Sequence, residues 1–452
     1  MQFLDSELTK KTLTLAFPVM LTQLGQVSVQ IFDNIIVGQL LGADALASVS
    51  LANAIFISFF VLALGMSLAI PPLVSEAHAQ KNHQEINRIF SHGGVINLGV
   101  GFLLMMMMLI GLPLLNYTGQ PEHVLPDTIS YLRIMGISII PFMLFQTLRE
   151  FSEGLSYTLG VTKATIAGNI LNIALNYIFI KGMFGIAPMG VDGAALATLI
   201  SRIFMFVLLY FILKKHRVTR RYILDFSIKA KMFSGDLFGK MIKLGIPTAL
   251  QIFFETSAFA AASFICGLIS SQDIAAHQIA LSVASSTFNI SIGIGVASTV
   301  MVGNRLGKQD FIGLRNVGIN NLKIIFLFMF FCGTVFIIGK NVIPLLFARP
   351  ENTAVISLAS RILIIAALFQ LSDGIQVVAM GILRGMQDVK IPSFITFVIY
   401  WVFVLPLGYY LCYVRKMGSY GMWISLGIGL SISAVLLLRR FLVMSRLKPE
   451  EV

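Results

Sequence analysis

Three carboxylates stand out in this 452-residue chain because they interrupt long apolar stretches. Asp33, Glu255 and Asp373 lie well inside predicted membrane spans, unlike most of the 21 acidic residues. A carboxylate at the centre of a span costs roughly 2.5–3.5 kcal/mol on the insertion scale, so it tends to face a cavity or an ion path. These three residues are therefore the first candidates for a functional site.

Glu255 and Asp373 belong to the second half of the chain and could converge from neighbouring helices. Two carboxylates in one desolvated pocket either repel, so that one holds a proton, or bind a cation that neutralises both. No Arg or Lys lies deep in predicted spans seven to twelve to pair with them. We therefore expect a coupling site for H+ or Na+, with both residues as ligands if the ion is Na+. The alternative is a pair of buried acids satisfied by Arg or by amides.

Asp33 ends a polar series in the first predicted span. Gln23, Gln26, Gln30 and Asp33 are spaced by 3, 4 and 3 residues, so they share one helical face. This stripe predicts the wall of a wet cavity, with Asp33 as a second protonatable site. The alternative is a structural carboxylate that a neighbouring amide caps.

Further side chains are candidates for the wall of a substrate cavity. Asn169, Asn172 and Asn176 are spaced by 3 and 4 residues in predicted span five and share a face. Gln278 and Phe288 lie in predicted span eight. For all five, helix-to-helix hydrogen bonding or ordinary packing is the alternative.

The elements that position these residues follow from composition. The chain is 57% hydrophobic and 12% charged, where a soluble protein carries about a quarter charged residues, which rules out a soluble enzyme. A bilayer needs about 20 apolar residues per helix, and the runs are too long for barrel strands. Twelve such runs occur, at 13–38, 46–74, 90–114, 127–148, 164–181, 190–213, 244–269, 275–303, 318–346, 354–382, 391–413 and 418–441. The sequence predicts an all-α polytopic membrane protein.

The distribution of basic residues predicts how the chain is oriented in the membrane. Of the 33 Lys and Arg residues, 25 lie in predicted inside segments and 6 in outside ones, if the N-terminus is cytoplasmic. Because Lys and Arg accumulate on the cytoplasmic side, we expect both termini there. The net charge of +12 then gives no ground for a nucleic-acid partner.

The two halves of the sequence resemble each other. Pro18 pairs with Pro247, Gly38 with Gly267 and Asp44 with Asp273 at one constant offset, and Gly190 pairs with Gly418 at almost the same offset. Since six spans are an even number, the second copy enters the membrane in the same direction as the first. Such a parallel repeat places a transport path between two six-helix bundles in known transporters.

This repeat predicts a division of the chain into three parts. Residues 1–213 form an N-terminal six-helix bundle, residues 214–243 a basic cytoplasmic linker, and residues 244–452 a C-terminal six-helix bundle. The linker is the longest polar connection of the chain, and it lies between predicted spans six and seven.

Enzyme and cofactor motifs were sought and not found. The sequence has no HExxH, GxSxG or P-loop motif, and its three cysteines form no zinc or haem pattern. We therefore expect no cofactor and no enzymatic activity, and an ion gradient in place of ATP as the driving force.

With these features in place, the chain resembles the multidrug and toxic compound extrusion (MATE) family over essentially its whole length. The motifs are FDNIIVGQLLGADALAS in span one, GNILNIALNYIFI in span five, GVDGAALATLIS at span six and IAAHQIA at span eight. Glu255 and Asp373 match the second-half carboxylates of the NorM-like branch, where members bind Na+ or a proton. Asp33 matches the family's first-span aspartate, which is implicated in coupling.

Two positions depart from the family pattern. Phe369 stands where members of the branch often carry a Tyr one turn before the span-ten aspartate, which removes a hydroxyl. Asn176 stands where archaeal-type relatives have an aspartate, so a first-half proton site would not rest on two carboxylates here.

The resemblance implies a Na+- or H+-coupled antiporter that exports amphipathic, mostly cationic compounds by alternating access. We expect a monomer in contact with lipids of the bacterial cytoplasmic membrane. A flippase for lipid-linked saccharides is the alternative. Its anionic cargo would call for a cationic cavity, whereas only Arg133 and Arg202 lie well within the predicted spans. A membrane-embedded enzyme is disfavoured because no reactive His, Cys or Ser constellation is visible, and His277 lies at an outer helix start beside Gln278.

Overall fold

The computed structural model describes residues 4–117, 119–121, 123–225 and 234–446. Every regular element of these residues is helical. The chain divides into two compact units: an N-terminal unit of Leu21–Ala249, and a C-terminal unit of Met1–Met20 with Leu250–Val452. The prediction of an all-α polytopic membrane protein is confirmed.

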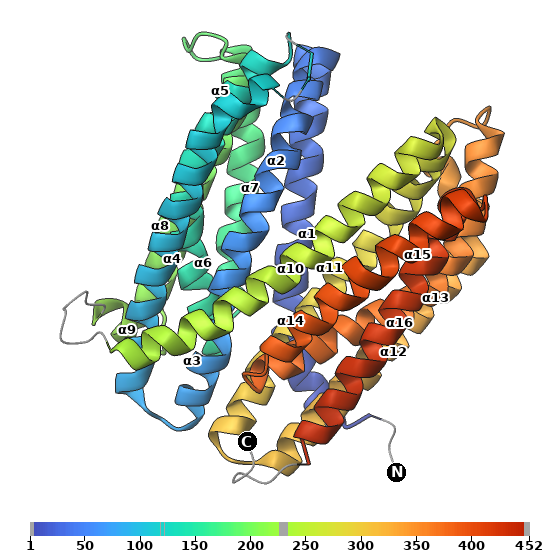
Figure 1. Cartoon of the computed structure of the whole chain (residues 1–452). Helices are drawn as coiled ribbons and strands as arrows, with labels where there is room; N and C mark the ends of the chain where they lie inside the picture. Colours follow the sequence, from blue (N-terminus) through green and yellow to red (C-terminus); the bar gives the residue numbers. More distant parts are fainter. Residues whose placement is uncertain (1–3, 118, 122, 226–233, 447–452) are drawn as a thin grey trace. The chain divides into compact units, whose positions relative to one another are not determined.

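The N-terminal unit is a bundle of long helices (Figure 1). Its elements are α2 (Ala43–Ser67), α3 (Ile70–Ala79), α4 (His83–Gly111), η1 (Leu112–Tyr117), α5 (Leu125–Ile137), α6 (Ile139–Gly154), α7 (Leu159–Lys181), α8 (Gly190–Lys215) and α9 (Arg220–Leu224). Helix α8 packs against α5, α6 and α7, and α4 packs against α6. A core that includes Phe56, Leu132 and Phe142 fills the space between these helices.

The C-terminal unit is built around one central helix. Its elements are α11 (Ser271–Gly307), α12 (Phe311–Gly339), η3 (Ile343–Leu346), α13 (Thr353–Gly385), α14 (Lys390–Phe397), η4 (Val398–Val404), α15 (Leu405–Tyr409), η5 (Tyr410–Val414) and α16 (Gly418–Met444). Helix α13 packs against α11, α12 and α16. The fully buried Trp423 of α16 lies in the core of this unit.

Two helices belong to both units. The boundary falls after Met20 in α1 (Ser6–Leu41) and after Ala249 in α10 (Gly235–Ile269). Each helix carries a proline shortly before the boundary, Pro18 and Pro247 respectively. A proline inside a helix removes one backbone hydrogen bond and favours a kink, so both boundaries fall at a weakened point of a helix.

Hydrogen bonds hold the first residues of α1 within the C-terminal unit. Thr12 Oγ1 donates to Asn321 Oδ1 at 2.7 Å, and the Asp5 backbone N–H donates to Asn320 Oδ1 at 3.0 Å. In the N-terminal unit, Lys240 of α10 lies 3.8 Å from Glu76. The amino-acid sequence alone did not predict this exchange of helix ends between the two halves.

Each of the twelve predicted spans coincides with helix. Among the described residues, eleven helical segments are long and apolar enough to cross a membrane. The predicted span outside this group is α7, which has 23 residues but carries the three asparagines of span five. The predicted span that falls outside the eleven is therefore the one that carries Asn169, Asn172 and Asn176.

Part of the predicted linker, residues 214–243, is helical. Helix α10 begins at Gly235, and its Leu237, Met241 and Leu244 are buried at a spacing of 4 and 3 residues. This apolar face makes the segment part of a helix. Residues 226–233 of the predicted linker lie outside the described residues. The division into two six-helix bundles at these positions stays a prediction.

Candidate functional site

Glu255 and Asp373 approach each other in the C-terminal unit. Glu255 projects from α10 and Asp373 from α13, and their carboxylates are close enough to interact electrostatically. Asp373 is 4% exposed, so water screens this like-charge interaction poorly. The structure thus brings together the two second-half carboxylates that the sequence singled out.

Two neutral side chains bind the carboxylate of Glu255. Gln376 Nε2 donates a hydrogen bond to Glu255 Oε1 at 3.0 Å, and the Tyr400 hydroxyl donates to the same oxygen at 3.4 Å. Gln376 Nε2 also donates to the Tyr400 hydroxyl oxygen at 3.0 Å. Both side chains are fully buried, which fixes the geometry around Glu255.

Arg384 is the cation of this region. It lies near the end of α13, beyond the predicted span, and interacts electrostatically with Glu255. Because Arg384 lies outside the predicted span, its proximity to the site could not be inferred from the sequence. With both carboxylates ionised, Glu255, Asp373 and Arg384 carry a net charge of −1, that is, −2 plus +1. A proton or a monovalent cation would balance it.

Phe369 does not contribute to the polar site. Its ring packs 5.3 Å from the ring of Trp423 and 6.2 Å from that of Phe259, centroid to centroid. The hydroxyl near the carboxylates comes from Tyr400 of η4 instead. Sequence reasoning missed Tyr400, because nothing in the chain indicates which residue of one helix faces a carboxylate on another.

Gln376 could have been found from its spacing. Gln370, Asp373 and Gln376 are 3 residues apart on α13 and are all buried. Gln370 Oε1 accepts a hydrogen bond from Thr287 of α11 at 3.1 Å. A polar stripe of this spacing on an apolar helix is the same signal that the sequence argument used for Asp33.

Asp33 in the N-terminal unit lies in an amide network. Asn176 Nδ2 donates to Asp33 Oδ1, and also to Asn172 Oδ1 at 3.2 Å. Asn172 in turn donates to Thr198 of α8 at 3.3 Å. The network thus joins α1, α7 and α8 through an amide that contacts Asp33, and the role of Asp33 as a protonatable site stays a prediction.

Arg202 balances the charge of Asp33. It interacts electrostatically with Asp33, and its guanidinium donates to Ser138 Oγ at 2.6 Å. The guanidinium also lies 5.0 Å from the centroid of the Phe56 ring and 5.3 Å from that of Phe142. Cation–π contacts of this kind stabilise a buried cation. The structure therefore pairs Arg202 with the first-half carboxylate.

The seven residues predicted to line a substrate cavity are divided between the two units. Five lie in the N-terminal unit (Gln26, Gln30, Asn169, Asn172 and Asn176) and two in the C-terminal unit (Gln278 and Phe288). Gln30 and Gln278 are exposed, and Phe288 is half-buried. Whether they line one cavity stays a prediction. Gln23, the first residue of the span-one stripe, accepts a hydrogen bond from Arg149 at 3.1 Å.

A buried ion pair lies at the end of α6. Arg149 Nε donates to Glu153 Oε1 at 2.9 Å, and the two side chains are 5% and 1% exposed. Glu150 is also buried and interacts electrostatically with Arg149. The sequence placed Arg149 in a connection after residue 148, but the helix continues to Gly154. The sequence contained a signal for this ion pair, because Arg149 and Glu153 are four residues apart and such residues are neighbours on a helix.

A Na+ ion would need neutral ligands in the C-terminal unit. Among the described residues, no group of three or more His, Cys, Asp or Glu side chains could hold a metal ion. Hard cations such as Na+ prefer oxygen ligands. The side-chain oxygens of Tyr400 and Gln376 lie beside Glu255 and could complement the two carboxylates.

Similar proteins are known from sequence. Multidrug resistance protein NorM of Photobacterium profundum is 33% identical over 437 residues, which cover 96% of this chain and 94% of that protein. A probable multidrug resistance protein NorM of Agrobacterium fabrum is 32% identical over 444 residues, with 96% and 94% covered.

Similar solved structures show the same fold. A eukaryotic MATE transporter superposes with a TM-score of 0.85 at 21% identity, covering 95% of this chain and 94% of that one. A MOP superfamily transporter from Pyrococcus furiosus superposes with a TM-score of 0.88 at 19% identity, covering 97% and 96%.

The family model of MatE matches the chain in two segments, residues 18–178 and 247–410. The two matches begin at Pro18 and Pro247, the prolines that the repeat pairs with each other. Because these segments cover most of the chain, the protein belongs to the MatE family.

Proposed function

We propose that the protein is a cation-coupled antiporter that exports amphipathic, mostly cationic compounds. The observation that carries this proposal is the buried pair of Glu255 and Asp373, in which Glu255 interacts electrostatically with a cation, Arg384, and Asp373 adds a second negative charge. A buried site with surplus negative charge takes up a proton or a cation. Na+ or H+ entering down its gradient would fill that role.

The coupling ion and the exported compound are exchanged because both compete for the same negatively charged carboxylates. A cationic compound is attracted while the carboxylates are unneutralised, and binding of the coupling ion weakens that attraction. One ligand shifts the binding of another only through such a difference in affinity between states. Tyr400 and Gln376 hold Glu255 in place during the exchange, and Asp33 serves as a second protonatable site.

The relatives support this cargo class and argue against other functions. The relatives that are 33% and 32% identical are described as multidrug resistance proteins. None of the enzyme motifs sought is present in the sequence. A flippase for lipid-linked saccharides is not favoured, because Arg202 is paired with Asp33 and enclosed by aromatic rings.

The composition of the sequence supports a location and an orientation for the protein. The protein would act as a monomer in the bacterial cytoplasmic membrane, with both termini on the cytoplasmic side. The bias of Lys and Arg toward the predicted inside segments supports this orientation.

Ethidium efflux from proteoliposomes tests the proposal. The purified protein is reconstituted, and efflux is measured under an imposed Na+ gradient and, separately, under an imposed pH gradient. We expect one of the two gradients to drive efflux, and Glu255→Gln and Asp373→Asn to reduce it to the level of empty vesicles. Glu351→Gln removes an exposed carboxylate of the same unit and serves as the control. Unchanged efflux in both site variants would overturn the proposal.

A further inference from the structure

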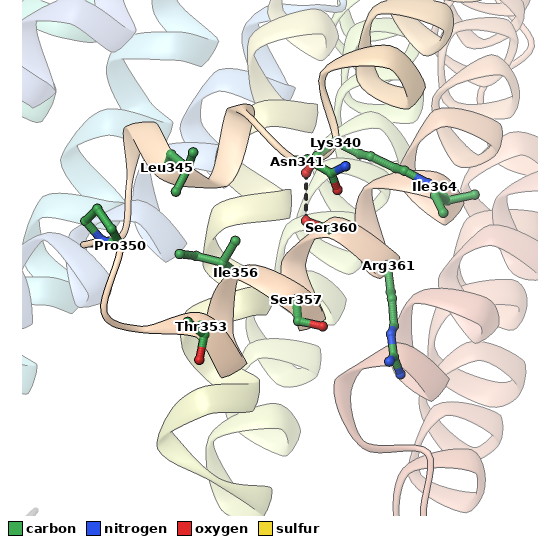
Figure 2. Close-up of a pocket in the computed structure, with 10 residues that line it drawn as sticks. All are labelled: Lys340, Asn341, Leu345, Pro350, Thr353, Ile356, Ser357, Ser360, Arg361 and Ile364. Atoms are coloured by element: carbon green, nitrogen blue, oxygen red, sulfur yellow. Dashed lines mark hydrogen bonds between the residues drawn. The ribbon is translucent and has the colours of Figure 1, made fainter.

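A cavity of about 520 Å³ lies in the C-terminal unit, away from the carboxylate site. Figure 2 shows that its lining residues come from two segments, the connection after α12 and the first turns of α13. The Ser360 hydroxyl donates to the Lys340 carbonyl oxygen at 2.8 Å and ties the two segments together (Figure 2). The proposed function makes no use of this cavity.

The cavity is lined by cations without a matching acid. Lys340 and Arg361 both line it, and neither belongs to an ion pair of the described part of the chain. Asn341, Thr353 and Ser357 add an amide and two hydroxyls to the lining. Two positive charges with several neutral hydrogen-bonding groups suit a phosphate.

The position of α13 adds to this preference for an anion. Helix α13 begins at Thr353, and the preceding residue, Asn352, makes no side-chain cap hydrogen bond. The N-terminal end of a helix carries a partial positive charge from its unpaired backbone N–H groups. The lining of the cavity therefore includes the positive end of a 33-residue helix at Thr353, and Arg361 follows about two turns later on the same helix.

Apolar side chains adjoin the cations. Leu345 and Ile364 line the cavity, and the neighbouring Ile338, Val342 and Leu346 are 78%, 62% and 78% exposed. These residues connect two helices that are long and apolar enough to cross a membrane, so they lie near a membrane surface. Exposed apolar side chains at that level contact acyl chains.

We propose that this cavity binds the phosphate headgroup of an anionic phospholipid, with the acyl chains lying along the apolar side chains of residues 338–346. Lys340 and Arg361 bind the phosphate, and Ser357, one turn before Arg361, donates a hydrogen bond to it. A cationic compound, the cargo class of the proposed function, would be repelled here. The inference does not depend on transport activity.

Native mass spectrometry of the purified full-length protein tests the proposal. The protein in detergent is titrated with phosphatidylglycerol and, separately, with zwitterionic phosphatidylcholine of the same chains. We expect at least one phosphatidylglycerol to bind in preference to phosphatidylcholine. Because each cation near a membrane surface adds to the attraction of an anionic lipid, the double variant K340Q/R361Q should lower phosphatidylglycerol affinity roughly 25-fold.

A matched control keeps the total charge change equal. R415Q/K416Q removes two exposed cations from another connection of the same unit and should retain the wild-type preference. If K340Q/R361Q does not fold, Ser357→Phe fills the cavity without changing its charge and should abolish the same binding event.

Three outcomes would overturn the proposal. The first is no preference of the wild-type protein for phosphatidylglycerol. The second is an equal loss of affinity in K340Q/R361Q and R415Q/K416Q. The third is displacement of phosphatidylglycerol by millimolar glycerol phosphate, since a headgroup without chains should not compete with a lipid that also uses the apolar side chains.

Discussion

The two halves of the chain share their turns and differ in their buried charges. Lys81 and Gln309 occupy equivalent positions of the repeat, and both adopt a left-handed backbone, with φ of 57° and 56°. The next residues, Asn82 and Asp310, are the N-caps of α4 and α12, and each accepts a hydrogen bond from the backbone N–H three residues later. The repeat therefore preserves helix starts closely.

The carboxylates do not follow the repeat. At the offset that joins Pro18 to Pro247, Asp33 corresponds to Ala262 and Glu255 corresponds to Gln26. Asp33 interacts electrostatically with Arg202, which gives a balanced pair, whereas Arg384 interacts with Glu255 and the second carboxylate, Asp373, leaves a surplus charge of −1. A duplicated scaffold thus holds two different electrostatic sites, and the surplus charge lies in the C-terminal unit.

The largest expected effect comes from moving a carboxylate to its repeat-equivalent position. We expect the double variant E255Q/Q26E to have no efflux, because Gln26 belongs to the N-terminal unit, whereas Asp373 and Tyr400 belong to the C-terminal unit. Ethidium efflux from proteoliposomes measures this. Efflux restored relative to Glu255→Gln would mean that the two halves are interchangeable, which contradicts the comparison.

A second carboxylate beside Asp33 should make the N-terminal site resemble the other one. Asn176→Asp changes its charge from balanced to −1 and should lower stability at neutral pH by about 3 kcal/mol, the order of an uncompensated buried charge. Lowering the pH or adding a cation should restore much of the lost stability, because either neutralises the extra carboxylate. Thermal unfolding across pH measures the loss. Asn169→Asp, on the same helix but half-buried, should have a smaller effect, and an equal loss would contradict this account.

The hydroxyl of Tyr400 should tune the ion site without abolishing it. Tyr400→Phe removes one hydrogen bond to Glu255, worth about 1 kcal/mol, and should change the half-saturating ion concentration about fivefold. For Na+ the concentration should rise, because an oxygen ligand is lost. For H+ it should fall, because the charged carboxylate loses a donor. Tyr409→Phe, an exposed site, is the control, and no shift in Tyr400→Phe would exclude a role for the hydroxyl.

The smallest effect concerns the two equivalent helix caps. The backbone N–H of Gly313 and the Arg305 guanidinium hold the pKa of Asp310 below its usual value. A carboxyl with a lowered folded-state pKa stabilises the protein above its unfolded pKa, about 3.9, and loses that contribution as pH falls through the folded value. Asp310→Asn should therefore lower stability by less than about 1 kcal/mol at neutral pH, since solvent screens the pair.

The difference between Asp310→Asn and the wild-type protein should shrink as pH falls below about 4, where the unfolded carboxyl takes up a proton, and should vanish only below the lower folded-state pKa. Thermal unfolding at about pH 7 and about pH 3.5 measures it. Asn82 already provides an uncharged cap at the equivalent position of α4, so Asn82→Ala should show no such pH dependence. A pH-independent difference for Asp310→Asn would assign the effect to the cap bond alone.

The helices and the buried carboxylates could be predicted from the sequence because both depend on local properties. The length of an apolar run and the cost of a charge within it need no knowledge of packing. These two properties placed twelve helical segments and selected Asp33, Glu255 and Asp373. Helix α7 is not among the eleven segments that are apolar enough to cross a membrane. It was still predicted as a span, because polar residues, Gly or Pro interrupt the chain on both sides of it.

The partners of those carboxylates could not be predicted in the same way. Tyr400 and Arg384 meet Glu255 only because α10, η4 and α13 pack in one particular register. Arg202 illustrates the same limit, since local sequence leaves open whether its partner is a carbonyl or a carboxylate. Contacts between helices far apart in the chain depend on packing that local patterns do not encode.

The division of α1 and α10 between the units bears on biosynthesis. Asp5 and Thr12, among the first described residues to leave the ribosome, hydrogen-bond to Asn320 and Asn321, which are synthesised much later. Large proteins usually fold domain by domain during synthesis. Here the C-terminal unit remains incomplete until the start of α1 meets α12, so a gene split at the central connection would yield two fragments that each lack a helix end held by the other.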